Sequence, residues 1–338
     1  MFEIPLTDIG GIRIGQVENA AAGTGVTVVV APEGMRASID VRGGGPASRE
    51  TRTLDPLAAA ERVHALVLGG GSAFGLDAAG GVMRFLEERG IGLPVMPGVV
   101  VPLVSQVDIF DLSVGDPSVR PDAAMGYAAA EAAFTGKAGN YRDGNYGAGC
   151  GATVGKLAGP QLAVKTGIGC FAVELGSLQV GAIVVVNACG DVYDSRTGRE
   201  IAGCRRQAEG AGAAHFIRSE QLAYAGFEAA CNAGNEPAPD PGMAANTTIG
   251  AVFTNAGLTK AQLAKLAGMA HDGYARAIRP VHTSMDGDSI FGVSLGNVSA
   301  PLDVVGVLAA DVMEEAIRRA VFSAEPAFGI PSASSLAR

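Results

Sequence analysis

The amino-acid sequence predicts a layered α/β fold, in which strands and helices pack against one another around apolar cores. Short apolar segments of strand length alternate along the chain with longer segments whose apolar residues recur at helical spacing. The chain has 338 residues, of which 49 are glycine, and 48% of its residues are hydrophobic whereas 17% are charged. Disordered chains are more polar than this, and the sequence lacks the G-X-Y repeat of collagen. We therefore expect a compact globular protein with many tight turns.

In the amino-terminal half, strands come first and helices follow. Thr24–Ala31 and His64–Leu68 are continuous apolar segments that predict strands. Ser72–Glu88 carries apolar residues at helical spacing up to Gly90, and the alanine-rich segment Asp122–Phe134 predicts a second helix. Further strands are expected, in order, at Leu162–Val164, Cys170–Val173 and Gly181–Val186.

In the carboxy-terminal half, a linker runs directly into a strand. A helix is expected at Ser219–Ala233. The following segment Asn235–Asn246 (NEPAPDPGMAAN) contains three prolines and has no periodicity, which indicates a linker. The next segment, Thr247–Thr254 (TTIGAVFT), has the composition of an apolar strand.

Two helices are expected after this strand. Thr259 and Gln262 have the spacing of a capping box, which predicts a helix that begins after Thr259. The last helix is expected to start near Pro301, and its apolar residues recur at helical spacing as far as Ala320. We find no internal repeat.

The charge, the hydropathy and the cysteines exclude several classes of function. The formal net charge is −9, and no basic run offers the electrostatic footprint of a nucleic-acid site. No apolar stretch reaches the roughly 20 residues of a membrane span, and the amino terminus lacks the pattern of a signal peptide. Five cysteines without a CxxC motif favour reduced thiols, and four histidines without i, i+4 pairing give no zinc signature. We expect a cytoplasmic protein with no nucleic-acid partner, no membrane span and no metal.

Two glycine-rich stretches resemble phosphate-binding or nucleophile motifs without matching them. Gly149–Lys156 (GCGATVGK) has Cys150 where a P-loop needs glycine, and Leu157 stands where a serine or threonine would hold magnesium. Gly69–Gly75 (GGGSAFG) has Phe74 in the third glycine position of GxGxxG and also fails the GxSxG pattern. We interpret both as turns in which the backbone approaches a neighbour closely. A role in lining a pocket stays open, because such turns expose N–H donors.

The junction of Asn246 and Thr247 has two interpretations. Threonine is a good strand residue, so the junction could simply join a loop to a strand. An amino-terminal threonine, however, brings its own base, because an α-amine with a pKa of about 7.7–8.0 can accept the hydroxyl proton. Thr247 would become amino-terminal by self-cleavage, in which its Oγ attacks the Asn246 carbonyl, the peptide becomes an ester and water releases it. Bends in the linker would allow the strained turn that this attack requires.

Several motifs in order along the chain resemble one known family. The carboxy-terminal ones are NTTIGAVFTNAGLTKAQ and HDGYARAIRPVHTSMDGDSIFGV, and the upstream ones are VRGGGPASRETRTLDPL, LGGGSAFGLDAAGGVMRFLEERG and GAGCGATVGKL. Together they resemble the DmpA-type aminopeptidases and nylon-oligomer hydrolases (NylC). The resemblance implies a self-processing N-terminal-nucleophile hydrolase with an αββα sandwich. It also implies a larger subunit, 1–246, and a smaller subunit, 247–338, of one catalytic domain, usually assembled as a homotetramer.

The resemblance also assigns roles to individual residues. Thr247 matches the nucleophile, and the Asn246–Thr247 bond matches the site of autocleavage. Lys156 of VGK matches the catalytic lysine and would hold the Thr247 hydroxyl and lower its pKa. Asn187 of VVVNACGD would donate an amide N–H to the oxyanion, and Asp286 and Asp288 of MDGD would orient the lysine or the new ammonium group. Each residue alone also has an ordinary structural interpretation, such as a solvated lysine, a strand end or a turn.

The function implied is hydrolysis of linear amides without a metal or cofactor. The substrates would be short peptides, amino-acid amides or 6-aminohexanoate oligomers, and the acyl group would pass through Thr247 to water. One alternative is acyl transfer to an amine, as in the ornithine acetyltransferases. A second alternative is a binding protein that is never cleaved. The acceptor of the acyl group distinguishes hydrolysis from acyl transfer. The length of the purified chain distinguishes a self-processing enzyme from a binding protein that is never cleaved.

Overall fold

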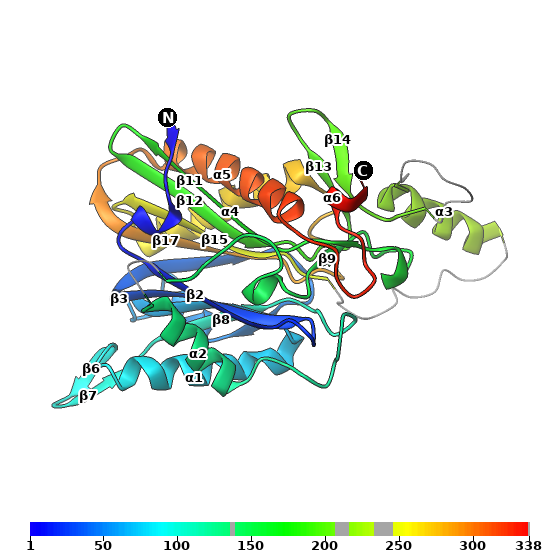
Figure 1. The fold of residues 1–338 in the computed structure, drawn as a ribbon. Helices are drawn as coiled ribbons and strands as arrows, with labels where there is room; N and C mark the ends of the chain where they lie inside the picture. Colours follow the sequence, from blue (N-terminus) through cyan, green and yellow to red (C-terminus); the bar gives the residue numbers. More distant parts are fainter. Residues whose placement is uncertain (136–138, 207–215, 233–245, 337–338) are drawn as a thin grey trace.

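Four layers make up the computed structural model, in the order helices, sheet, sheet, helices (Figure 1). It describes residues 1–135, 139–206, 216–232 and 246–336. The helices α4 (Lys260–Ala277) and α5 (Leu302–Phe322) cover one outer face, and α1 (Ala78–Glu87) and α2 (Ala123–Ala133) cover the other. This arrangement confirms the αββα sandwich that the sequence resemblance implies.

The strand β3 (Thr24–Val41) connects the two sheets. Its first part pairs with β2 and β5, and its last part, from Arg36 onward, pairs with β17. The first sheet contains β11 (Ile168–Leu175), β12 (Leu178–Val185), β15 (Ile249–Ala256) and β17 (Ser289–Val298), with β1 (Phe2–Glu3) at its edge. The second contains β2 (Arg13–Asn19), β5 (Val63–Gly69), β8 (Val104–Asp108) and β4 (Ala47–Arg49).

Three apolar cores separate the four layers. On β12, successive side chains point to opposite faces, so Val184 joins the core under α4 and α5 whereas Ile183 joins the core between the sheets. Phe291 and Leu66 enter that middle core from β17 and β5. Phe85 of α1 lies in the third core, between the second sheet and its helices. The long apolar runs of the strands therefore reflect burial on both faces.

The ends of the predicted helices are confirmed where capping signals exist. Thr259 and Gln262 form both hydrogen bonds of the capping box at the start of α4. Asp122 accepts a hydrogen bond from the backbone N–H of Met125 at the start of α2. The helix α5 begins directly after Pro301, as expected.

Two predicted elements are partly wrong. Ser72–Asp77 forms a 3-10 turn before α1, because Gly71 and Ser72 have left-handed backbone angles that an α-helix cannot contain. Phe74, which lies in the predicted helix segment Ser72–Glu88, is 58% exposed. Pro160–Leu162 also forms a 3-10 turn, so the strand expected at 162–164 is reduced to β10 (Val164–Lys165).

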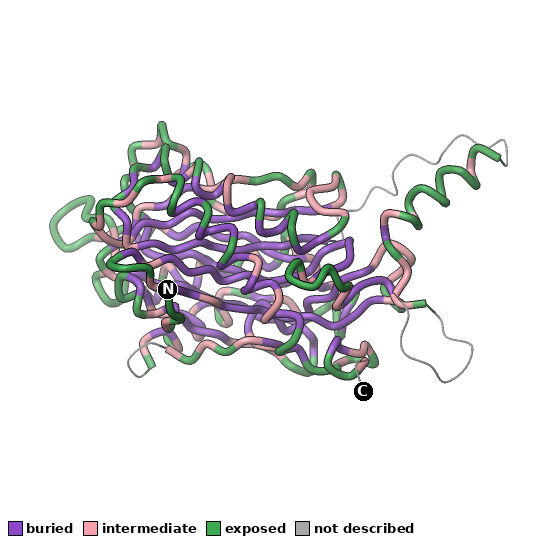
Figure 2. Tube along the Cα trace, turned by 90° about the horizontal axis from the view of Figure 1, so that it is seen from above, coloured by how far each residue is buried: buried purple, intermediate pink, exposed green. Residues whose placement is uncertain are grey.

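Several short elements complete the described fold. The helix α3 (Ser219–Asn232) extends away from the body and buries only Ser219 among its residues (Figures 1 and 2). The expected linker lies, up to residue 245, outside the described residues. The smaller strands and the last helix are β6 (Leu93–Met96), β7 (Val99–Val101), β9 (Thr153–Val154), β13 (Asp191–Asp194), β14 (Arg199–Ala202), β16 (Ile278–Arg279) and α6 (Ala333–Leu336).

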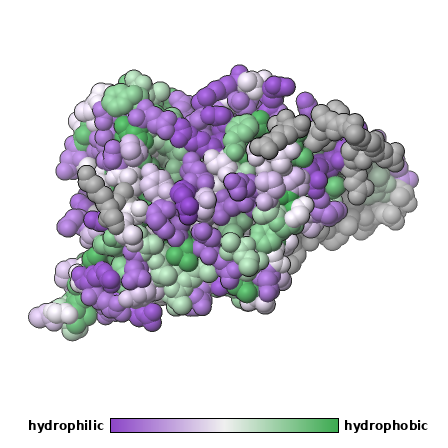
Figure 3. All heavy atoms as spheres, viewed as in Figure 1, coloured by the Kyte–Doolittle hydropathy of each residue, from purple (hydrophilic) through white to green (hydrophobic). Residues whose placement is uncertain are grey.

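The surface is mixed in character. Hydrophilic and hydrophobic residues are interspersed over the face in Figure 3. Within the described ranges, no helix combines the length and the hydropathy needed to cross a membrane. In the same part of the chain, no group of three His, Cys, Asp or Glu side chains is arranged to hold a metal ion.

Candidate active site

The site lies where β12 ends and where β15 and β17 begin. Thr247 precedes β15, and its backbone N–H donates to the carbonyl of Asn187, which follows β12, at 3.0 Å. The carbonyl of Asn246 accepts a hydrogen bond from the backbone N–H of Gly287, which precedes β17, at 3.0 Å. Thr247 is 3% exposed. The intact Asn246–Thr247 bond is therefore fixed and buried between the ends of two neighbouring strands.

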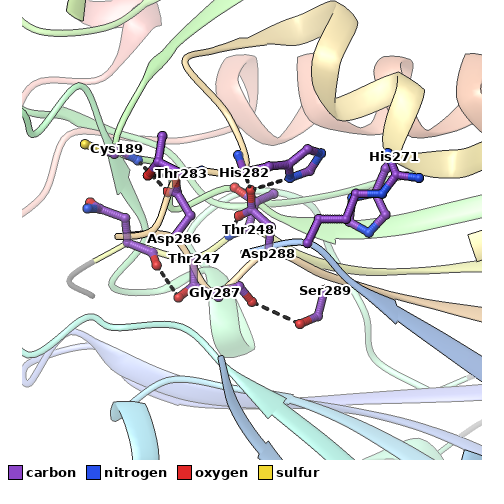
Figure 4. Close-up of polar contacts among 12 residues, drawn as sticks. Cys189, Thr247, Thr248, His271, His282, Thr283, Asp286, Gly287, Asp288 and Ser289 are labelled. Carbon is purple, nitrogen blue, oxygen red and sulfur yellow. Dashed lines mark hydrogen bonds and ion pairs between the residues drawn. The ribbon is translucent and has the colours of Figure 1, made fainter. Parts of the chain in front are cut away.

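The hydroxyl group of Thr247 lies against the carbonyl that self-cleavage would attack. Its Oγ donates a hydrogen bond to the carbonyl oxygen of Asn246 (Figure 4). A Cβ atom on residue 287 would lie 2.7 Å from this Oγ and 2.8 Å from the carbonyl oxygen of Gly45. The backbone can approach the hydroxyl this closely because residue 287 is glycine.

Lys156 reaches this site through Asn187. Its Nζ donates to the Asn187 backbone carbonyl at 3.0 Å and to the side-chain Oδ1 at 2.8 Å. Desolvation lowers the pKa of Lys156 to about 7, although Cys189, Asp286 and Asp111 act in the opposite direction. Because Nζ and the Thr247 nitrogen share one carbonyl acceptor, the amine and the scissile bond lie close together.

Glycine turns bring Lys156 to Asn187. Gly155 has a φ of +70°, and a Cβ at this position would lie 2.1 Å from a backbone carbon of Gly203. The next residue, Lys156, is held by a hydrogen bond from its backbone N–H to the carbonyl of Cys189 at 3.1 Å. The GCGATVGK stretch thus contains a close backbone approach, as expected for a glycine turn, and its lysine lies at the candidate site.

The side chain of Asn187 is fixed at both ends. Its Oδ1 accepts from Lys156 and from the backbone N–H of Thr153 at 3.1 Å, and its Nδ2 donates to the carbonyl of Phe110 at 3.0 Å. In the intact chain this N–H group is directed to Phe110, whereas we expected it to face the oxyanion. The role in the reaction that we expected for Asn187 stays a prediction.

Asp286 is buried among donors from two segments. One carboxylate oxygen accepts from the backbone N–H of Cys189 at 3.3 Å, and the other accepts from the N–H and the Oγ1 of Thr283 at 3.1 and 2.6 Å. Burial and the charge of Asp288 raise the pKa of Asp286. These contacts hold backbone segments together, and the expected role of Asp286 in orienting Lys156 or the new ammonium group stays a prediction.

Asp288 holds the backbone next to the nucleophile. Its Oδ1 accepts from the N–H of Thr248 at 2.7 Å, and its Oδ2 accepts from the backbone N–H and the ring Nδ1 of His282 at 3.1 and 2.9 Å (Figure 4). Sequence reasoning missed His282, Thr283 and Gly287 as site residues. The available signal was their position in the run HTSMDGD, next to the two aspartates.

Known proteins match this chain over almost its whole length. The family model described as peptidase family S58 matches residues 5–333. The chain belongs to peptidase family S58. An uncharacterized aminopeptidase of Mycobacterium leprae is 41% identical, and the match covers 97% of this chain and 92% of that protein. A 6-aminohexanoate-oligomer endohydrolase of Agromyces sp. is 32% identical, and its match covers 93% of this chain and 84% of that protein.

Solved structures share the fold of this S58 chain. The L-aminopeptidase D-Ala-esterase/amidase of Ochrobactrum anthropi, described as a variant of the Ntn hydrolase fold, superposes with a TM-score of 0.67 at 18% identity. That match covers 95% of this chain and 86% of the other. A beta-aminopeptidase of Burkholderia sp. superposes with a TM-score of 0.64 at 20% identity, over 100% and 94% of the two chains. The S58 chain is thus a hydrolase of its family with the Ntn hydrolase fold.

Proposed function

We propose that this S58 chain is a self-processing amide-bond hydrolase whose nucleophile is Thr247. The observation that carries the proposal is the geometry at the intact bond. The Thr247 hydroxyl contacts the Asn246 carbonyl oxygen, and the N–H of Gly287 donates to that same oxygen at 3.0 Å. A backbone N–H aimed at a carbonyl stabilises the negative charge that develops on its oxygen during nucleophilic attack.

Self-cleavage follows from these groups as a balanced reaction. Thr247 Oγ bonds to the carbonyl carbon of Asn246 while its proton passes to the neutral amine of Lys156. The bond from that carbon to the Thr247 nitrogen then breaks, and Lys156 returns the proton to the departing nitrogen. Water hydrolyses the resulting ester and leaves a carboxylate on Asn246 and a free amine and hydroxyl on Thr247. Lys156 suits this shuttle because its lowered pKa of about 7 provides both protonation states near neutral pH.

Turnover of substrates would use the same hydroxyl group. After cleavage, the α-amine of Thr247 accepts the hydroxyl proton, Oγ attacks the substrate carbonyl, and the amine product leaves. Water then releases the acyl group from Thr247. The segments 1–246 and 247–338 would remain one catalytic unit, because β15 pairs with β12 of the first segment and with β17 of the second.

The substrates we propose are short peptides, amino-acid amides and 6-aminohexanoate oligomers. Proteins described as uncharacterized aminopeptidases are among the relatives at 39–41% identity, and 6-aminohexanoate-oligomer endohydrolases are among those at 32%. The higher identity favours aminopeptidase activity, whereas the Asn246–Thr247 junction resembles that of the nylon-oligomer hydrolases and favours oligomer hydrolysis.

A substrate panel tests this proposal. Purified protein is incubated with alanine p-nitroanilide, a dipeptide amide and the 6-aminohexanoate dimer, and the released amine is measured. We expect hydrolysis of at least one of them, and we expect the Thr247→Ala variant to hydrolyse none. Turnover by Thr247→Ala at the parent rate would show that another residue is the nucleophile. Adding a free amine acceptor distinguishes hydrolysis from acyl transfer, since only transfer gives a new amide product.

A further inference from the structure

His282 has an unusual backbone conformation for a residue with a side chain. It lies in the loop between β16 and β17, and its φ is +59° in the left-handed region. Such residues are uncommon, and they persist where surrounding contacts hold them, often at functional sites. Here the contacts are two hydrogen bonds from one residue to one oxygen, because the backbone N–H and the ring Nδ1 of His282 both donate to Asp288 Oδ2.

The ring of His282 is held in place from the side of α4. The ring of His271 packs edge-on against it with centroids 4.6 Å apart, and the ring of Tyr274 stacks on it at 6.0 Å. Both neighbours are buried, and the side chain of His282 is 17% exposed. Its Nε2 has no hydrogen-bond partner among the described residues, so Nδ1 is the ring atom that connects His282 to the site.

Asp288 links the ring of His282 to the residue next to the nucleophile. It is fully buried, so its carboxylate oxygens need hydrogen-bond donors from the protein. The donors are His282 on one oxygen and the N–H of Thr248 on the other, at 2.7 Å. Thr248 is bonded directly to Thr247, so the orientation of Asp288 sets the backbone that carries the attacking hydroxyl group.

We propose that His282 is a positioning residue for Thr247, which acts through Asp288 and Thr248 and does not touch the reacting atoms. This inference rests on the proposed function of Thr247. Without the Nδ1 donor, Oδ2 of Asp288 keeps only the backbone N–H of residue 282, so the carboxylate and Thr248 are held less firmly. Both self-cleavage and turnover would then slow, whereas substrate affinity would change little.

Three variants of His282 separate the donor from the backbone conformation. His282→Gly accepts the left-handed φ but lacks the donor. His282→Asn tolerates the same φ and offers an amide N–H near the position of Nδ1. His282→Ala lacks the donor and strains the backbone. The rates of self-cleavage, the kcat and KM for alanine p-nitroanilide and the thermal midpoint are measured for each.

We expect His282→Gly to lower kcat and the cleavage rate by about 10- to 100-fold, the factor that a hydrogen bond to a charged group is worth. We expect KM to stay within about threefold and His282→Asn to restore most of the rate. A glycine variant as fast as the parent, or an asparagine variant as slow as the glycine variant, would overturn the proposal.

A second measurement does not depend on cleavage. In uncleaved Thr247→Ala protein, we expect the Thr248 amide hydrogen to exchange faster when His282→Gly is added, and to return toward the slower rate with His282→Asn. Unchanged exchange in both double variants would contradict the positioning role even if Thr247 is the nucleophile. Cleavage in the Thr247→Ala protein would instead contradict the proposed function. The exchange rate of the Thr248 amide would still report on the positioning role of His282.

Discussion

Lys156 illustrates how the fold changes the chemistry of a single residue. An exposed lysine is charged at neutral pH, whereas desolvation lowers the pKa of this one to about 7. Below pH 7 the amine is protonated and cannot accept the Thr247 proton, so we expect the rate of self-cleavage to rise through pH 7 and level off above it. The measurement is the half-time of cleavage of freshly refolded chain between pH 5.5 and 9.

Variants of Lys156 show whether its proton or its charge matters. Lys156→Arg keeps a positive charge that stays protonated at these pH values, and Lys156→Ala removes it. If Lys156 transfers a proton, both variants cleave about 10²–10⁴-fold more slowly than the parent. An arginine variant that cleaves at the parent rate would show that only the charge contributes, and a parent profile that is flat with pH would contradict a role for an amine with a pKa of about 7.

The sequence predicts which residues belong to the site better than what they contact. The family resemblance assigns five candidate residues, and the structure brings all of them to the same strand ends: Thr247, Lys156, Asn187, Asp286 and Asp288. Their partners depend on the register of β12, β15 and β17, which no local pattern of residues specifies. The donor at Gly287 is a backbone N–H group, so no side-chain motif in the sequence indicates its role.

At the scale of the elements, the turn before β17 has little room for a larger residue at Gly287. A Cβ on Gly287 would lie 2.7 Å from Thr247 Oγ, so we expect Gly287→Ala to displace the hydroxyl group and to block self-cleavage. Gly226→Ala is the matched control, because a Cβ on Gly226 of α3 meets nothing within 4 Å. Electrophoresis under denaturing conditions compares the two. Normal cleavage of Gly287→Ala would contradict the close approach at the site.

The capping box of α4 tests an element-scale prediction of stability. Thr259→Ala removes the side-chain oxygen that accepts from the backbone N–H of Gln262, and we expect a loss of about 1 kcal/mol in the free energy of unfolding. Thr259→Ser keeps the acceptor and should lose little. Urea unfolding of both variants, in the Thr247→Ala protein so that the chain stays intact, measures the difference. Equal midpoints for the alanine and serine variants would argue against the cap.

Local signals explain which elements were predictable. The cap at Thr259 and the alanine-rich α2 carry their own start signals, so both were predicted. The helix expected from Ser72 was wrong over Ser72–Asp77, because Gly71 and Ser72 have left-handed backbone angles that the helical spacing of apolar residues does not reveal. The strand β17, next to the two aspartates, was not predicted, because its Gly292 and Gly296 make it look like a loop.

In the whole molecule, the two segments proposed to arise from cleavage are interleaved. The strand β15 lies between β12 and β17, and α5 packs in one core with β12. We therefore expect 1–246 and 247–338 to elute together in size-exclusion chromatography under native conditions and to separate only in denaturant. Separate elution in native buffer would contradict the single catalytic unit.

We propose that Thr247 cuts the chain at its own amino side. Intact mass spectrometry of the purified protein tests this cleavage, with Thr247→Ala and Thr247→Ser prepared in parallel. We expect the parent and the serine variant to give two masses, those of residues 1–246 and 247–338, and the alanine variant to give one mass for the whole chain. A parent chain that stays whole after prolonged incubation at neutral pH, or an alanine variant that is cut at the same bond, would contradict the claim.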